Sequence, residues 1–90
     1  MTKALISVTG LDTTGIIAGV ATKLSEMNIN ILDITQTILD GYFTMMMIVD
    51  ISGAPLDFDG INRELQPVRE ELKMEIHMQR MDIFDAMHRI

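Results

Sequence analysis

The dipeptide Asp40-Gly41, in the middle of a 90-residue chain, is the feature that most constrains the fold. It lies between two strand-like runs: residues 30–39 (NILDITQTIL) are rich in β-branched side chains, and residues 42–51 (YFTMMMIVDI) are largely apolar. An Asp-Gly pair in this position is typical of a two-residue β-hairpin, because both turn positions require a positive φ angle. The sequence therefore predicts an antiparallel strand pair at the centre of the chain.

The chain before this hairpin predicts one strand, a loop and one helix. Residues 3–9 (KALISVT) alternate between apolar and polar side chains, as a half-buried strand does. Residues 10–14 form the loop, and from residue 15 to about residue 27 the apolar side chains repeat with the spacing of one helix face. We expect Thr13 or Thr14 to cap this helix.

The chain after the hairpin predicts a second helix and a fourth strand. Asp57 or Asp59 can cap the helix, and Pro67 lies inside it, where a kink or a break is expected because proline lacks an N–H donor. Residues 73–81 alternate again as a strand. The buried stripe of the second helix is expected to comprise Ile61, Leu65, Val68 and Leu72.

This order of elements predicts an α+β, ferredoxin-like fold. Two strand–helix–strand halves joined by a hairpin give a four-stranded antiparallel sheet with two helices on one face. We assign residues 1–81 to this domain. Residues 82–90 (DIFDAMHRI) are expected to form a short C-terminal helix belonging to the same domain.

The third strand carries more apolar side chains than one buried face requires. Both of its faces are substantially apolar, although an antiparallel sheet with one wet face should alternate cleanly. One face comprises Phe43, Met45, Met47, Val49 and Ile51, and the other comprises Tyr42, Thr44, Met46 and Ile48. We expect the second face to be covered by the terminal helix or by another subunit, and we expect a homodimer. The sequence leaves open whether the two chains pair side by side or face to face.

Charge and composition exclude several functions. The net charge of −6 disfavours a nucleic-acid partner and an anionic membrane surface. The chain has no cysteine, and neither His77 nor His88 pairs with a carboxylate at metal-ligand spacing, so we expect no cofactor and no metal. No apolar run is long enough for a membrane span or a signal core, so we expect a cytoplasmic protein.

The segment GLDTTG, from Gly10 to Gly15, has the glycine spacing of a phosphate-binding loop but lacks the rest of the motif. Ile16 and Ile17 follow where a P-loop requires lysine and then serine or threonine. The dinucleotide pattern G-x-G-x-x-G is absent, and the loop contains no arginine to hold phosphate. No acid, base or nucleophile grouping is evident, so we do not expect an enzyme.

The same stretch carries groups that suit a small zwitterion. Asp12 can accept hydrogen bonds from a ligand ammonium, and the first N–H groups of the following helix favour a carboxylate. We expect Asn28 and Asn30, at the entry to the second strand, to lie near this loop. Their side-chain amides can both donate and accept hydrogen bonds, so they are able to contact such a ligand.

At this point the chain resembles the ACT domain, a small amino-acid-sensing module. The resemblance rests on Asp12, Gly15 and Ile16, followed by a helix that ends in Met27-Asn28-Ile29-Asn30-Ile31, and on the order of elements over residues 1–81. The whole chain is similar to the small stand-alone ACT proteins of bacteria and archaea and to the ACT repeats of the glycine-cleavage-system transcriptional repressor.

The resemblance implies a non-catalytic regulatory domain that pairs with a second copy and binds an amino acid at the subunit interface. It matches Asp12 to the polar loop residue, Gly15 to the loop-closing glycine and Asn30 to an asparagine that contacts ligand. Thr14 departs from the pattern, because many members have proline there. The candidate ligand-binding residues are therefore Asp12, Thr13, Thr14, Gly15, Ile16, Asn28, Asn30 and Ile31.

Two functions remain open from the sequence. The first is a dimeric domain that binds an amino acid and passes the signal to a separate enzyme or regulator. The second is a ligand-free module that docks a partner protein through its Met-rich sheet face and its C-terminal helix.

Overall fold

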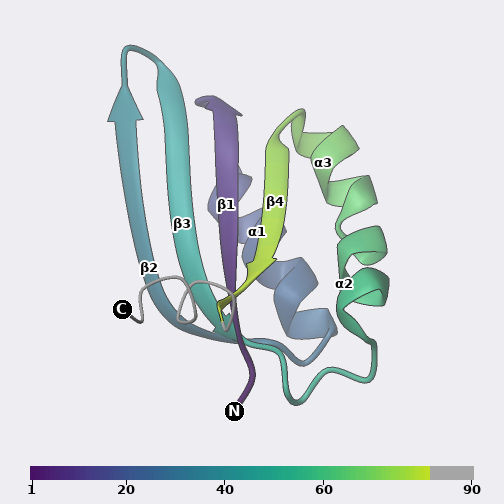
Figure 1. Ribbon diagram of the computed structural model, residues 1–90. Helices are drawn as coiled ribbons and strands as arrows, with labels where there is room; N and C mark the ends of the chain where they lie inside the picture. Colours follow the sequence, from purple (N-terminus) through teal and green to yellow (C-terminus); the bar gives the residue numbers. More distant parts are fainter. Residues whose placement is uncertain (82–90) are drawn as a thin grey trace.

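Within residues 1–81, four strands and three helical segments follow one another in the order that the sequence predicts, except that the second helix is divided (Figure 1). The computed structural model describes residues 1–81, so the helix expected over residues 82–90 lies outside the described residues. The elements are β1 (Lys3–Leu11), α1 (Ile16–Glu26), β2 (Asn30–Leu39), β3 (Tyr42–Asp50), α2 (Phe58–Glu64), α3 (Gln66–Leu72) and β4 (Glu75–Arg80).

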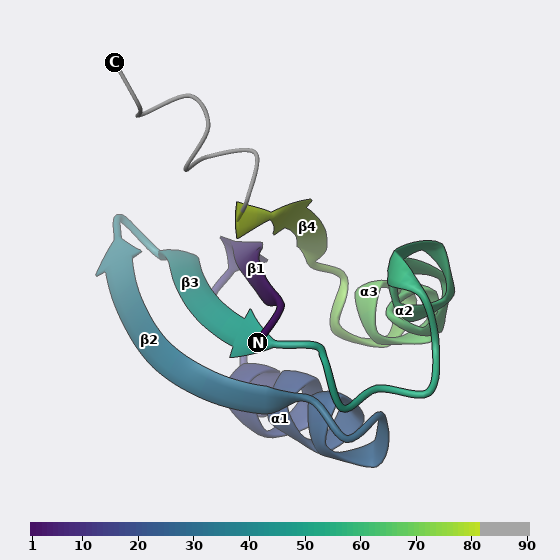
Figure 2. The ribbon, with the colours of Figure 1, turned by 60° about the horizontal axis from the view of Figure 1, so that its bottom comes forward.

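The strands form one antiparallel sheet in the order β2-β3-β1-β4. Figure 2 shows the sheet curving around α1 and the α2–α3 pair, which lie on the same side of it. The predicted ferredoxin-like arrangement is confirmed. Strand β2 forms one edge of the sheet and β4 the other.

The central hairpin is formed as predicted. Asp40 and Gly41 have φ angles of 53° and 79°, and Leu39 lies opposite Tyr42 in the β2–β3 pair. These positive angles match a turn whose twist fits the twist of the two strands.

Two details at the start of α1 differ from the prediction. Gly15, with a φ angle of 89°, occupies the N-cap position, and no side chain caps the helix. The predicted threonine cap is therefore wrong, because the cap position falls on the glycine after Thr13 and Thr14. Strand β1 also continues to Leu11, since its pairing with β3 runs on until Leu11 lies opposite Tyr42.

Of the kink or break expected at Pro67, the structure shows a break. Helix α2 ends at Glu64 and α3 begins at Gln66, so Pro67 lies in the first turn of α3, where its missing N–H costs nothing. The Arg69 guanidinium secures the break: its Nε donates to the Ile76 carbonyl at 2.8 Å, and another nitrogen donates to the Asn62 carbonyl at 3.0 Å.

Among residues 1–81, one apolar core lies between the sheet and the helices, and none of its buried residues is polar. The predicted stripe of the second helix is confirmed at Ile61, Leu65 and Val68, and Leu72 packs against the core although it is partly exposed. Strand β3 contributes Phe43, Met45, Met47 and Val49, which belong to one of the two apolar faces that its sequence predicts.

Candidate functional site

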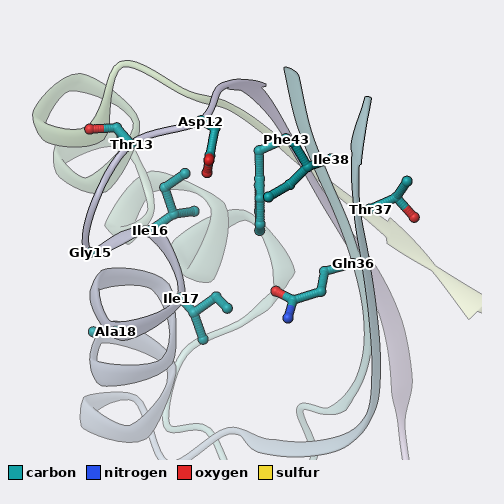
Figure 3. Close-up of a pocket in the computed structure, with 10 residues that line it drawn as sticks. All are labelled: Asp12, Thr13, Gly15, Ile16, Ile17, Ala18, Gln36, Thr37, Ile38 and Phe43. Carbon is teal, nitrogen blue, oxygen red and sulfur yellow. The ribbon is translucent and has the colours of Figure 1, made fainter. Parts of the chain in front are cut away.

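A cavity of about 620 Å³ opens between the β1–α1 loop, the start of α1 and the outer part of the sheet (Figure 3). The loop, the first turn of the helix and two strands each supply part of its wall. The lining residues are Asp12, Thr13, Gly15, Ile16, Ile17, Ala18, Gln36, Thr37, Ile38 and Phe43.

The loop at this cavity is fixed at both ends. The backbone N–H of Asp12 donates to the Gly41 carbonyl at 2.9 Å, which ties the loop to the β2–β3 hairpin. At the other end, the Gly19 N–H donates to the Gly15 carbonyl at 2.9 Å and starts the helical bonding pattern. Because Gly15 has a positive φ angle, a residue with a side chain would be strained there. A glycine is therefore required where the chain turns from the loop into α1.

The first turn of α1 leaves hydrogen-bond donors facing the cavity. The N–H groups of Ile16, Ile17 and Ala18 precede the first intrahelical bond, and no side chain caps them. All three residues line the cavity. Such a helix end attracts an anionic group, because its unpaired N–H groups and the helix dipole act in the same direction.

Two polar side chains face this space from opposite walls. Figure 3 shows the Asp12 carboxylate directed into the cavity from the loop and the Gln36 amide directed toward α1 from β2. Ile17, Ile38 and Phe43 supply the apolar surface between them. The arrangement offers a carboxylate, an amide, backbone donors and an apolar wall. It can hold a small molecule that carries both charges.

Four of the predicted ligand-binding residues line this cavity, namely Asp12, Thr13, Gly15 and Ile16. The Thr13 hydroxyl points away from it in Figure 3. Thr14 is exposed and is not part of the lining.

Asn28 and Asn30 lie at the other end of α1, and the expectation that one chain brings them close to Asp12 is wrong. An eleven-residue helix spans about 16 Å, so residues before and after it cannot share a small site in one chain. The Asn28 side chain instead donates to the Gly53 carbonyl at 3.0 Å, and its backbone is left-handed with a φ angle of 59°. Asn28 therefore joins the α1–β2 turn to the loop after β3.

Asn30 and Ile31 begin β2, opposite Asp50 and Val49 of β3. Asn30 is exposed and Ile31 is half-buried against the core. Nearby, the Ser52 hydroxyl and the Ser52 and Thr2 N–H groups donate to the Asp50 carboxylate, and these hydrogen bonds hold the pKa of Asp50 below its usual range. This end of the sheet is separate from the cavity within one chain.

The wall that β2 and β3 provide was not predicted from the sequence. Gln36 and Ile38 project to the helix side of β2, where Ile38 lies opposite Phe43. The sequence could have indicated this pairing. In a hairpin whose two-residue turn is Asp40-Gly41, Leu39 lies opposite Tyr42 and Ile38 lies opposite Phe43. The lateral position of α1 relative to β2, which opens the cavity, has no such signal.

The helices do not fully cover the β2 side of the sheet. Its helix-side residues Ile34 and Ile38 remain 41% and 58% exposed, and Leu39 is 76% exposed. The strand is also a sheet edge, so its outer backbone N–H and C=O groups are available for pairing. A long edge strand with exposed apolar side chains is typical of a surface that pairs with another chain.

Within residues 1–81, no group of three histidine, cysteine, aspartate or glutamate side chains could hold a metal ion.

The helices of the described part of the chain are too short and too polar to cross a membrane.

Comparisons with known proteins identify the family. A family model described as ACT domain matches residues 2–79. A UPF0237 protein from Listeria innocua is 53% identical over 88 residues, which is 98% of this chain and 99% of the relative.

Two solved structures are similar to this chain. An ACT domain protein from Streptococcus pneumoniae is 44% identical, with a TM-score of 0.83 over 97% of this chain and 98% of that one. The ligand-free regulatory subunit of aspartate kinase from Thermus thermophilus is 25% identical, with a TM-score of 0.68 over 87% and 51%. This chain therefore belongs to the ACT domain family, whose domains are typically regulatory and bind small ligands.

Proposed function

We propose that this protein is a non-catalytic, homodimeric regulatory domain that binds an amino acid at the β1–α1 loop. The observation that carries the proposal is the cavity in which Asp12, the first-turn N–H groups of α1 and Gln36 face one space. The likeness to the regulatory subunit of aspartate kinase supports a regulatory role.

Each end of an amino acid has a counterpart in the cavity. The carboxylate accepts hydrogen bonds from the N–H groups of Ile17 and Ala18, and the ammonium donates to Asp12. The side chain of the amino acid then lies along Ile17 and Ile38, within reach of the Gln36 amide. A bound zwitterion thereby replaces its water contacts with charged and dipolar partners at both ends.

A second copy completes this site through the β2 edge. Antiparallel pairing of two β2 strands over their full length sets the partner's Asn30 opposite Leu39, beside the hairpin that holds the Asp12 loop. The same pairing buries the exposed Ile34 and Ile38. Asn30 and Ile31, which are distant from the cavity in one chain, therefore contribute to the site of the other chain.

Thermal unfolding in the presence of each of the twenty amino acids tests the ligand. Any ligand that binds only the folded state stabilises it, by about 2.7 kcal/mol at a hundred times Kd. We expect at least one amino acid at millimolar concentration to raise the melting temperature. If none of the twenty changes it, the proposed function is wrong.

Two isosteric variants locate the site. Asp12→Asn removes the charge that accepts the ammonium and should abolish the shift without lowering the melting temperature of the free protein. Asp40→Asn removes one charge from the nearby hairpin, where asparagine also suits the positive φ angle. It should retain the full shift. An equal loss in both variants would indicate a general charge effect instead of a site at Asp12.

A further inference from the structure

Strand β4 forms the second edge of the sheet, and its alternate residues direct their backbone groups away from β1. The Ile51 N–H donates to the Thr2 carbonyl at 2.8 Å and so extends the β1–β3 pair by one position. Even-numbered residues of β1 therefore bond to β3 and odd-numbered ones bond to β4, because hydrogen bonds alternate along an antiparallel strand. On β4, His77 lies opposite an odd-numbered residue, so the N–H and C=O groups of its neighbours Ile76 and Met78 point outward.

Arg69 of α3 covers the outward carbonyl of Ile76. Its Nε donates to this carbonyl at 2.8 Å, which is a typical length for a charge-assisted hydrogen bond. Figures 1 and 2 show α3 beside β4, so the arginine reaches the sheet edge from a neighbouring helix. A strand added to this edge would need to place its own N–H group where the guanidinium lies.

Further hydrogen bonds fix the guanidinium in this position. Its two terminal nitrogens donate to the Asn62 carbonyl at 3.0 Å and to the Asn62 side-chain oxygen at 2.6 Å. One of them also donates to the Gln66 side chain at 3.2 Å. Arg69 is half-buried, so its side chain is not a freely moving surface group. An added strand would have to break these hydrogen bonds in order to displace it.

The cover on β4 has a consequence for assembly. If two chains join through β2, the joined sheet has one β4 strand at each of its two ends. Pairing of these ends with the ends of further dimers would repeat without limit, so the sheet would grow instead of closing. Strand β4 has six residues and only alternate ones face outward, so one covered carbonyl removes a large share of the hydrogen bonds that a pairing strand could form.

We propose that Arg69 limits assembly: its guanidinium keeps β4 from pairing with a strand of another copy, so that pairing through β2 stops at two chains. The final number of chains rests on the homodimer of the proposed function, whereas the cover on β4 does not. Arg69 acts from α3 and uses no residue of the amino-acid site. Covering an edge strand, or placing a charged side chain on it, is a common way in which proteins prevent sheets from joining.

Sedimentation velocity on four full-length proteins tests this role. Arg69→Met keeps the alkyl chain but loses the donors, and it should form folded species larger than the wild type, with a mass that rises with protein concentration. Ile34→Asp should be a monomer, and the double variant should form only pairs of chains, joined through β4. A folded Arg69→Met protein with the wild-type mass would overturn the proposal.

The same four proteins separate this proposal from the proposed homodimer. If the wild type and Ile34→Asp are both monomers, the homodimer through β2 is wrong. The role of Arg69 is then supported if Arg69→Met forms dimers and overturned if it stays monomeric.

Asn28→Ala controls for the loss of stability, which can by itself promote assembly. This variant also loses a hydrogen bond to a backbone carbonyl, but that carbonyl belongs to Gly53 in the loop after β3. It should keep the wild-type mass, and an equal rise in mass would overturn the proposal. Circular dichroism shows whether each variant is folded. If Arg69→Met does not fold, Asn62→Ala removes only the side-chain acceptor of the guanidinium. It should raise the mass in the same direction, and a wild-type mass would overturn the proposal.

Discussion

At the scale of single residues, Asn28 shows how one side chain type can fit two explanations. An amide at the entry to β2 is chemically able to bind a ligand, yet here it donates to the Gly53 carbonyl and sits in the left-handed region. The absence of a side chain at Gly53 allows this close approach, because an added Cβ would lie 3.1 Å from the Asn28 amide nitrogen. Within one chain Asn28 therefore holds two loops together.

Replacing Asn28 should lower the free energy of unfolding. Asn28→Ala removes one hydrogen bond and forces alanine into the unfavourable left-handed conformation, so it should lower the free energy of unfolding by about 2 kcal/mol. Asn28→Gly loses the hydrogen bond but tolerates the conformation, so it should cost about half as much. Urea unfolding measures both values. Equal costs for the two variants would contradict the assignment of backbone conformation.

Asp50 should make stability depend on pH below about 4. Its hydrogen bonds from Ser52 and Thr2 lower its pKa in the folded state, so the stabilisation is fully present above the unfolded value of about 3.9 and is lost as the pH falls through the folded value. Asp50→Asn should therefore be less stable than wild type at pH 7, with a difference that shrinks at pH 3. A constant difference for Asp50→Asn would contradict this role.

At the scale of elements, local chemistry made most of the fold predictable from the sequence. The Asp40-Gly41 turn fixed the hairpin and its register, and Pro67 divided the second helix because its ring and missing N–H act on the backbone directly. The cap of α1 was less predictable, since a threonine and a glycine can both end a loop. Asp12 and Asn30 are far apart in one chain because α1 lies between them. The expectation that they lie close together did not take the length of this helix into account.

The break between α2 and α3 depends on Arg69. Its guanidinium also donates to the Asn62 side chain at 2.6 Å, and so it joins α2, α3 and β4. Arg69→Met should lower the free energy of unfolding by about 2 kcal/mol, because charge-assisted hydrogen bonds are lost. Arg69→Lys should recover only part of it, since lysine lacks the planar fork.

The matched control for Arg69 is Arg63→Met, an exposed arginine in the last turn of α2. It should change stability by less than about 0.5 kcal/mol. If the two methionine variants are equally stable, Arg69 does not secure the break.

For the whole molecule, the proposed dimer depends on pairing between the β2 edge strands of two chains. Ile34→Asp places a charge on the exposed helix side of this strand and should convert a dimer of 10.1 kDa chains into a monomer. Glu75→Lys changes a charge on the opposite edge strand, β4, and should leave the dimer intact. Sedimentation equilibrium distinguishes the two masses. A dimer that survives Ile34→Asp would place the interface elsewhere.

We propose that each ligand site takes Asp12 from one chain and Asn30 from the other. A mixture of two variants tests it most directly, with ligand binding measured by isothermal titration calorimetry on an amino acid that stabilises the wild type. Asp12→Asn and Asn30→Ala should each bind nothing alone. Exchanged in equal amounts, half of the dimers contain both chains, and each of these has one site with both native residues.

The mixture should recover about a quarter of the wild-type sites, with wild-type affinity. If mixing recovers no binding while the chains exchange freely, Asp12 of one chain and Asn30 of the other do not form a common site, and the shared site is wrong.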